Sequence, residues 1–210
     1  MKKALFILAA IATLTGCAPQ MVASNISVFH SPEFANAAQR SIIVVPVDDA
    51  QKSSLEFKTY AHEVETQLLA AGFTLAPNLK QADYAANINY GINNGKEILD
   101  SMPVYGQTGS TTSYSPYTNS VTSIPSYGIT GYQTTSHTEY TRMFKLDIID
   151  TRKSTPGNVV KIFEGHVQSV GGSASFSTVS RCLIQALFQN FPGENGKTYS
   201  ISIPSQQCMQ

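Results

Sequence analysis

The chain alternates between stretches with strand-like and helix-like spacing of apolar residues. Residues 41–47 form a nearly unbroken β-branched run, which is typical of a strand covered on both faces. Ser53 and Glu56 then have the spacing of a helix capping box, and apolar residues recur three and four apart until Gly72. The pattern therefore predicts a strand followed by a helix that packs its apolar stripe against a sheet.

Three more strands and a second helix are predicted further along the chain. Apolar and polar residues alternate over 82–92, which indicates a half-buried strand. The same period returns at 144–148 and, after a polar turn, at 159–167, which predicts a hairpin. Helical spacing over 175–191 predicts the second helix. The predicted fold is α+β: a small mixed or antiparallel sheet with two helices packed on one face, in the order β-α-β-β-β-α.

A long stretch before the hairpin, residues 101–138, contains no Asp, Glu, Lys or Arg and is rich in Ser, Thr, Gly and Tyr. Tyrosine offers a large contact area at modest entropic cost, so one interpretation is a binding surface for a partner. The other is a long flexible hairpin tip whose ends extend the flanking strands, and the scarcity of large aliphatic residues favours it. The tyrosines of the candidate surface are Tyr105, Tyr114, Tyr117, Tyr127 and Tyr132.

The composition fits one globular domain. The 210 residues are 42% hydrophobic, which is enough for a core, and only 13% are charged. The 14 basic and 14 acidic side chains cancel, and no basic cluster occurs, so a nucleic-acid partner is not expected. We expect a tether over 17–40, a single domain over 41–204 that contains the insertion 101–138, and a short tail over 205–210.

The first sixteen residues have the three parts of a secretory signal peptide: a basic start, an apolar run and a small-residue end. The apolar run from Ala4 to Leu14 would cover roughly 16 Å as a helix, about half of a bilayer core, so it is too short to span one. The sequence Leu14-Thr15-Gly16-Cys17 resembles the lipobox of bacterial lipoproteins.

That resemblance implies cleavage between Gly16 and Cys17 and attachment of diacylglycerol to the Cys17 thiol, with a further acyl chain on the freed amine. Two or three acyl chains suffice for stable anchoring, so membrane lipid is the expected partner of the anchor. Ala18 follows the anchor, whereas lipoproteins kept at the inner membrane typically carry Asp there. By that analogy the protein is expected at the outer membrane, facing the periplasm. No cofactor is expected beyond the covalent lipid.

Two cysteines remain after lipidation, Cys182 and Cys208. An even number of thiols in an oxidising compartment is compatible with a disulfide, which would fasten the end of the chain to the second helix. The alternative is a buried Cys182 and an unpaired Cys208, and both interpretations stay open. No cysteine or histidine cluster has zinc-ligand spacing, so no metal site is expected.

Several core-forming segments resemble a family of uncharacterised proteobacterial lipoproteins with a domain of unknown function of the DUF4136 type. They include SLEFKTYAHEVETQLLAAGF, ADYAANINYGINNG, YTRMFKLDIID and CLIQALFQNFPGENG. The resemblance covers roughly residues 26–203 and implies a fold rather than a mechanism. It brings no catalytic residues to carry over.

Catalytic motifs are incomplete in this chain. His62 and Glu63 begin an HExxH zinc motif, but Thr66 stands where the second histidine should be. Neither a GxSxG nor a phosphate-binding loop occurs. We therefore expect a non-enzymatic lipoprotein that binds an envelope protein or contributes to envelope integrity. The alternative is a small-molecule or glycan-binding module that uses the tyrosine-rich insertion, and a hydrolase is the least supported interpretation.

Overall fold

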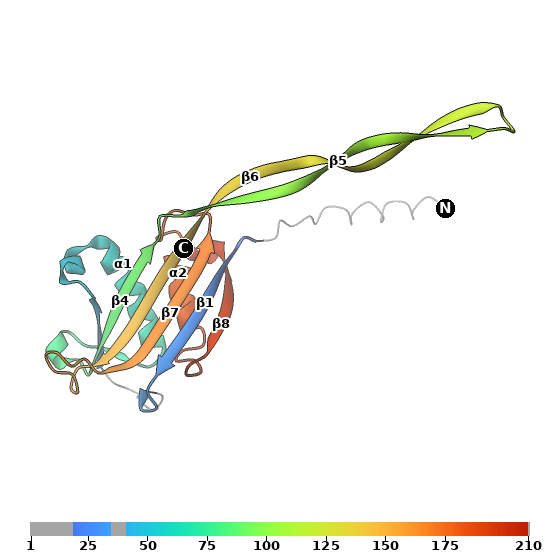
Figure 1. Cartoon of the computed structure of the whole chain (residues 1–210). Helices are drawn as coiled ribbons and strands as arrows, with labels where there is room; N and C mark the ends of the chain where they lie inside the picture. The colour runs from blue at the N-terminus through green and yellow to red at the C-terminus, as the bar shows by residue number, and fades with distance from the viewer. Residues whose placement is uncertain (1–18, 35–40, 210) are drawn as a thin grey trace, which may run out of the picture. The chain divides into compact units, whose positions relative to one another are not determined.

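A computed structural model of the protein describes residues 19–34 and 41–209 (Figure 1). The chain divides into two compact units. The first, the sheet unit, contains the described residues up to Gly91 together with 142–169 and 175–209. The second, the ribbon unit, contains Ile92–Thr141 and Val170–Ala174. The predicted insertion 101–138 lies within the ribbon unit, which begins nine residues earlier, at Ile92.

The strands form a mixed sheet of eight, seven of them in the order β3-β2-β4-β6-β7-β1-β8 (Figure 1). β2 runs parallel to both β3 and β4, whereas β1 is antiparallel to both β7 and β8. β6 and β7 form the predicted hairpin, and β5 lies off this path and pairs with β6. The strands of the path are β1 (Met21–His30), β2 (Ser41–Pro46), β3 (Thr74–Leu75), β4 (Tyr84–Ile92), β6 (Ser120–Asp150), β7 (Lys161–Gly171) and β8 (Thr198–Pro204).

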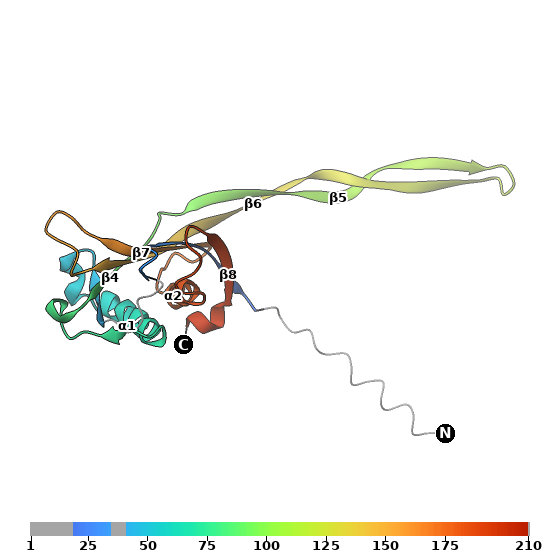
Figure 2. The ribbon, with the colours of Figure 1, turned by 90° about the horizontal axis from the view of Figure 1, so that it is seen from below.

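Two helices, α1 (Leu55–Ala70) and α2 (Ser180–Phe188), lie on the same side of the sheet (Figure 2). The α+β class and the placement of both helices on one face are as predicted. The helix starts differ, however. Ser54, not Ser53, caps α1 by accepting a hydrogen bond from the Phe57 backbone N–H at 3.4 Å, because Ser53 ends a preceding 3-10 turn. α2 begins at Ser180 rather than near 175.

The predicted order misses β1 at one end of the chain and β8 at the other. Residues 21–30, expected within a tether, form a strand between β7 and β8, because every second residue from Val22 to Val28 is buried. Ser24 is one of these buried positions, which blurs the apolar alternation. In β8, Ile201 and Ile203 alternate with serines in the same way.

The core lies between the sheet and the two helices. α1 contacts β2, and α2 contacts β1 and β8. The largest fully buried side chains are Ile26, Ile42, Leu68, Tyr84, Ile88, Phe144, Leu146, Ile148, Phe163, Leu183, Ile184 and Leu187. Strand and helix residues that are far apart in the sequence therefore share one apolar layer.

The end of the chain is fixed to α2. Residues 205–208 form the short 3-10 helix η4 instead of the expected tail, and Cys208 is joined to Cys182 by a disulfide with a Cα–Cα distance of 5.0 Å. Both cysteines are buried. The last described residues are therefore part of the sheet unit.

The ribbon unit is built around a two-stranded antiparallel hairpin (Figure 1). β5 (Lys96–Ser115) pairs with residues 120–139 of β6, so each strand extends for about 65 Å. The turn over 116–119 has Asn119 at a φ of 49°, a conformation that asparagine tolerates. The insertion is a long hairpin that extends the flanking strands, and strand pairing continues to the turn because Thr, Tyr and Val favour extended backbone.

Candidate functional site

Four of the five predicted tyrosines lie on a single face of the ribbon. Directly opposed residues of an antiparallel pair point to the same face. The register pairs Pro103 with Tyr132, Tyr105 with Ile129, Gln107 with Tyr127, and Tyr114 with Val121. These pairs share one face with Leu99 and Pro125. We call this surface the tyrosine face: Leu99, Pro103, Tyr105, Tyr114, Val121, Pro125, Tyr127, Ile129 and Tyr132.

Two β-bulges place these tyrosines together. Tyr105 and Tyr114 are nine residues apart and Tyr127 and Tyr132 are five apart, so strict alternation would put the members of each pair on opposite faces. The register shifts once in β5, between Gln107 and Gly109. It shifts a second time in β6, between Ile129 and Gly131, which pair with Tyr105 and Val104. Each shift adds one residue to one strand, which returns the second tyrosine to the face of the first.

The extra residues are Thr108 in β5 and Thr130 in β6, and both are held by the neighbouring strand. The Thr108 hydroxyl donates to the Ser126 carbonyl at 3.3 Å, and the Thr130 hydroxyl donates to the Val104 carbonyl at 3.2 Å. A Cβ built on Gly106 would lie 2.9 Å from Thr130 Cγ2. The glycine therefore leaves room for the threonine that forms the bulge.

The tyrosine face is open to solvent. Tyr105, Tyr114, Tyr127 and Tyr132 are 72%, 58%, 73% and 67% exposed. Tyr117, the fifth predicted tyrosine, lies in the turn outside the strands and is 99% exposed. The opposite face carries mainly glycine, serine and threonine with three exposed apolar side chains, Met102, Val104 and Ile124, and it has no tyrosine.

Formal charges occur only at the base of the ribbon. The last acidic residue before the uncharged stretch is Asp100 and the first one after it is Glu139. His137 lies between them, with Nδ1 3.1 Å from Asp100 Oδ2 and Nε2 3.6 Å from Glu139 Oε1. The tyrosine face can therefore contribute contact area, aromatic stacking and hydroxyl hydrogen bonds, but no ion pairs.

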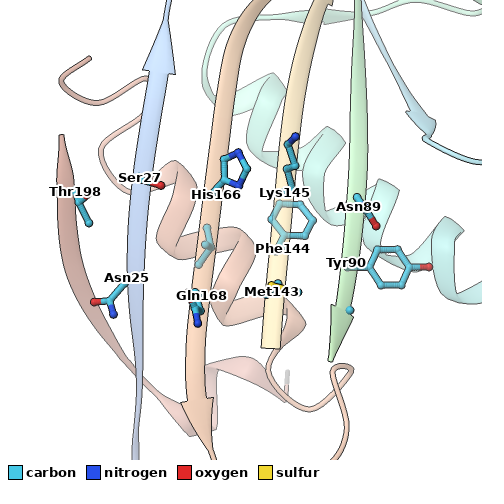
Figure 3. A pocket seen from close by; sticks show the side chains of 12 residues that line it. Asn25, Ser27, Asn89, Tyr90, Met143, Phe144, Lys145, His166, Gln168 and Thr198 are labelled. Carbon is cyan, nitrogen blue, oxygen red and sulfur yellow. The ribbon is translucent and has the colours of Figure 1, made fainter. Parts of the chain in front are cut away.

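The sheet unit has a shallow hollow of about 350 Å³ on the sheet face that the helices leave uncovered (Figure 3). Its volume falls at the lower end of the range for small-molecule sites. Its polar lining consists of amide and hydroxyl groups together with one lysine and one histidine, and Tyr90, Met143, Phe144 and Val167 add apolar surface. The polar lining residues are Asn25, Ser27, Asn89, Lys145, His166, Gln168 and Thr198.

Carboxylates neutralise the lysines near this hollow. Lys145 and Lys161 both approach Asp147 Oδ2, at 3.1 and 3.0 Å. Lys161 also donates to Glu164 Oε1 at 2.8 Å, and this hydrogen bond holds the pKa of Glu164 below its usual range. Since the lysine charges are balanced within the sheet, the hollow fits an uncharged polar molecule better than an anion.

A second hollow, of about 520 Å³, lies between α1 and the start of α2. Its acidic groups already have partners. The Tyr60 hydroxyl donates to Glu56 Oε1 at 3.0 Å, and Arg181 forms a paired contact with Glu63 at 3.2 and 3.3 Å. Burial, followed by the hydrogen bond to Glu56, raises the pKa of Tyr60.

The histidines that could serve catalysis do not converge. His62 lies on exposed α1 surface, and Thr66 uses its hydroxyl to bond the His62 carbonyl. His30 contacts the carbonyls of Ser31 and Gly193, whereas His166 lies on the open sheet face. Among residues 19–34 and 41–209, no cluster of three His, Cys, Asp or Glu side chains has the geometry to hold a metal ion.

The predicted cleavage site at Gly16 and the lipid attachment residue Cys17 lie outside the described residues. Within the part of the chain that the structure does describe, no helix is long and apolar enough to span a membrane.

The chain is similar to several solved structures at low identity. One is a PDZ domain protein from Parabacteroides distasonis, with a TM-score of 0.46 and 16% identity over 90% of this chain. The chain spans only 40% of that protein's length. A DUF4136 family protein from Bacteroides thetaiotaomicron gives a TM-score of 0.41 and 10% identity, over 82% of this chain and 97% of that one. The PelC dodecamer from Paraburkholderia phytofirmans gives 0.38 and 12%, over 82% and 99%.

None of the curated proteins matches the chain. The sequence profile of one family, described as a domain of unknown function, matches residues 25–193. This range includes most of the sheet strands, both helices and the whole ribbon hairpin. The protein therefore belongs to the DUF4136 family, as the resemblance of its core segments predicted.

Proposed function

We propose that this protein is a lipoprotein anchored to the outer membrane through Cys17, and that its folded part faces the periplasm. In this proposal it acts by binding another envelope component and catalyses no reaction. Support for the anchor comes from the signal-peptide pattern and the lipobox-like sequence. The disulfide between Cys182 and Cys208 supports an oxidising compartment, because such bonds persist there.

The proposed binding role rests on one observation: two bulges bring four exposed tyrosines to the same face of the ribbon. A folding requirement would not explain this arrangement, since the tyrosines are 58–73% exposed. Tyrosine is enriched among the residues that dominate binding energy at interfaces, where one truncation costs about 2 kcal/mol or more. β-Bulges commonly re-aim side chains beside functional surfaces.

Site-specific photo-crosslinking in intact cells tests this role. A photoreactive amino acid at Tyr114 lies on the tyrosine face, whereas one at Ser113 points to the opposite face at almost the same place. We expect crosslinked products from position 114 and few or none from position 113. Equal yields from both positions, or none from 114, would rule out the tyrosine face as the binding surface.

The anchor is tested separately with Cys17→Ser. The thiol is the group that accepts the lipid, so this variant is expected in the soluble fraction or as unprocessed precursor. Mass spectrometry of the wild-type protein should find an acylated residue 17 at the N-terminus. Mature, membrane-bound Cys17→Ser protein would contradict the proposed anchor.

A glycan or another small uncharged polar molecule is the second candidate ligand, and the hollow on the open sheet face favours it. Amide groups such as those of Asn25, Asn89 and Gln168 both donate and accept hydrogen bonds, which suits hydroxyl-rich molecules. Asn89→Ala and Gln168→Ala should then weaken retention on immobilised glycans, with Asn78→Ala, away from the hollow, as the control. Retention that is equal in all three variants would exclude this site.

A further inference from the structure

We propose that the tyrosine face binds the tyrosine face of a second copy of this chain. This inference rests on the proposed function, since it names the partner of that same surface. Three properties of the ribbon support it: its lack of charge, its exposed area and the one-sided placement of its aromatic rings.

The lack of charge favours an identical partner. When two copies of one charged surface meet, both surfaces carry the same net charge, and like charges at close range repel. Most protein surfaces that bind a different partner use complementary charges for steering and specificity. The stretch 101–138 has no Asp, Glu, Lys or Arg over 38 residues, so two such ribbons meet without repulsion.

The exposed area is sufficient for a stable contact. An aromatic side chain can bury roughly 150–250 Å², so four tyrosines at 58–73% exposure offer about 500 Å². Leu99, Val121 and Ile129 are 68%, 65% and 46% exposed and bring the total to about 800 Å² per copy. A standard interface buries about 800 Å² per partner, so the tyrosine face alone reaches this size.

The placement of the rings along the ribbon suits a two-fold contact. Tyr132, Tyr105 and Tyr127 occupy successive positions of the tyrosine face in the middle of the ribbon, and Tyr114 lies next to the turn. An antiparallel second ribbon centred on Tyr105 therefore brings Tyr132 of one copy opposite Tyr127 of the other. Paired aromatic rings contribute about 0.5–1.5 kcal/mol beyond their burial. The opposite face carries no tyrosine, which makes the contact specific to one face.

Two differently tagged full-length copies, produced in the same cells, test this inference. A photoreactive amino acid replaces Tyr127 in one copy, and in the control it replaces the neighbouring Ser126, which points to the opposite face. We expect position 127, but not position 126, to give a product of about twice the chain mass that carries both tags.

The other outcomes separate the two proposals. A product from position 127 that contains a different protein and only one tag would overturn the homotypic contact and leave the proposed binding function intact. Absence of any product from position 127 would overturn both. Equal two-tag products from positions 126 and 127 would overturn the face-to-face contact, because pairing along the ribbon edges would expose both faces alike.

Charge substitution provides an independent test. Gln107 and Tyr127 are opposed in the middle of the tyrosine face. Changing both to Glu, or both to Lys, places like charges in the contact, and we expect either variant alone to lose two-tag crosslinks from position 114 by about tenfold or more. Glu copies mixed with Lys copies should regain them. Undiminished crosslinking in either variant alone, or a failure of the mixture to recover, would overturn the inference.

Discussion

Removal of the disulfide between Cys182 and Cys208 should destabilise the sheet unit strongly. The bond joins α2, in the core, to η4 at the end of the chain, and the two cysteines are 26 positions apart in the sequence. Both side chains are buried, so the cross-link lies inside the packed structure rather than on its surface. Without it, η4 depends only on noncovalent contacts with α2 and β8.

The expected size of the effect follows from the length of the closed loop. A cross-link over 26 residues removes conformational entropy from the unfolded chain that is worth about 3.5 kcal/mol at 25 °C. This is a large share of the roughly 5–15 kcal/mol by which a domain is usually stable. The free energy of unfolding should fall by this amount. The slope of the denaturant dependence should rise, because the unfolded chain becomes more expanded.

Urea unfolding of the Cys17→Ser protein, oxidised and reduced, measures this difference without the acyl anchor. The double variant Cys182→Ser/Cys208→Ser is the control, since a reducing agent should leave its unfolding unchanged. If the oxidised and reduced proteins differ by less than about 1 kcal/mol, the entropic reasoning is refuted.

Three further predictions concern the sheet unit. Leu183→Ala should lower the free energy of unfolding by about 2–5 kcal/mol, because Leu183 is fully buried, and urea unfolding measures it. Gly165→Ala should lower the melting temperature, since its Cβ would lie 2.8 Å from Leu187 Cδ1 in the packed core; an unchanged melting temperature would contradict this. Burial raises the pKa of Tyr60 above 10.0, so this tyrosine ionises in the unfolded chain at a lower pH than in the folded protein. The free energy of unfolding should therefore fall as the pH rises above about 10. In Tyr60→Phe, urea unfolding should show a smaller fall in this free energy between about pH 8 and about pH 11.

The sequence predicts the helical side of the fold better than the sheet. The apolar stripe of α1 and the alternation in β4 are local patterns, and both elements are where the patterns place them. β1 escapes prediction because its buried positions include Ser24, and β8 because three of its seven residues are serine or threonine on the open face. Neighbouring strands bury β1 and β8, and this burial cannot be seen in the sequence patterns of the two segments themselves.

The candidate binding surface is only half predictable. Composition alone singles out the tyrosines and the absence of charge between 101 and 138. Their common face depends on the bulges at Thr108 and Thr130, which arise from pairing between residues about 20 to 30 positions apart. A rule of strict alternation would separate Tyr127 from Tyr132, so no local pattern leads to the tyrosine face.

Because β1 starts at Met21, only residues 18–20 separate it from the proposed lipid on Cys17. The four Cα–Cα steps from residue 17 to residue 21 span at most about 14 Å even when fully extended, which is less than half the thickness of a bilayer core. In an acylated protein this short linker would hold the sheet unit close to the membrane, with the start of β1 and the end of β8 next to the lipid headgroups. A partner of the sheet unit would therefore have to meet it at that membrane surface.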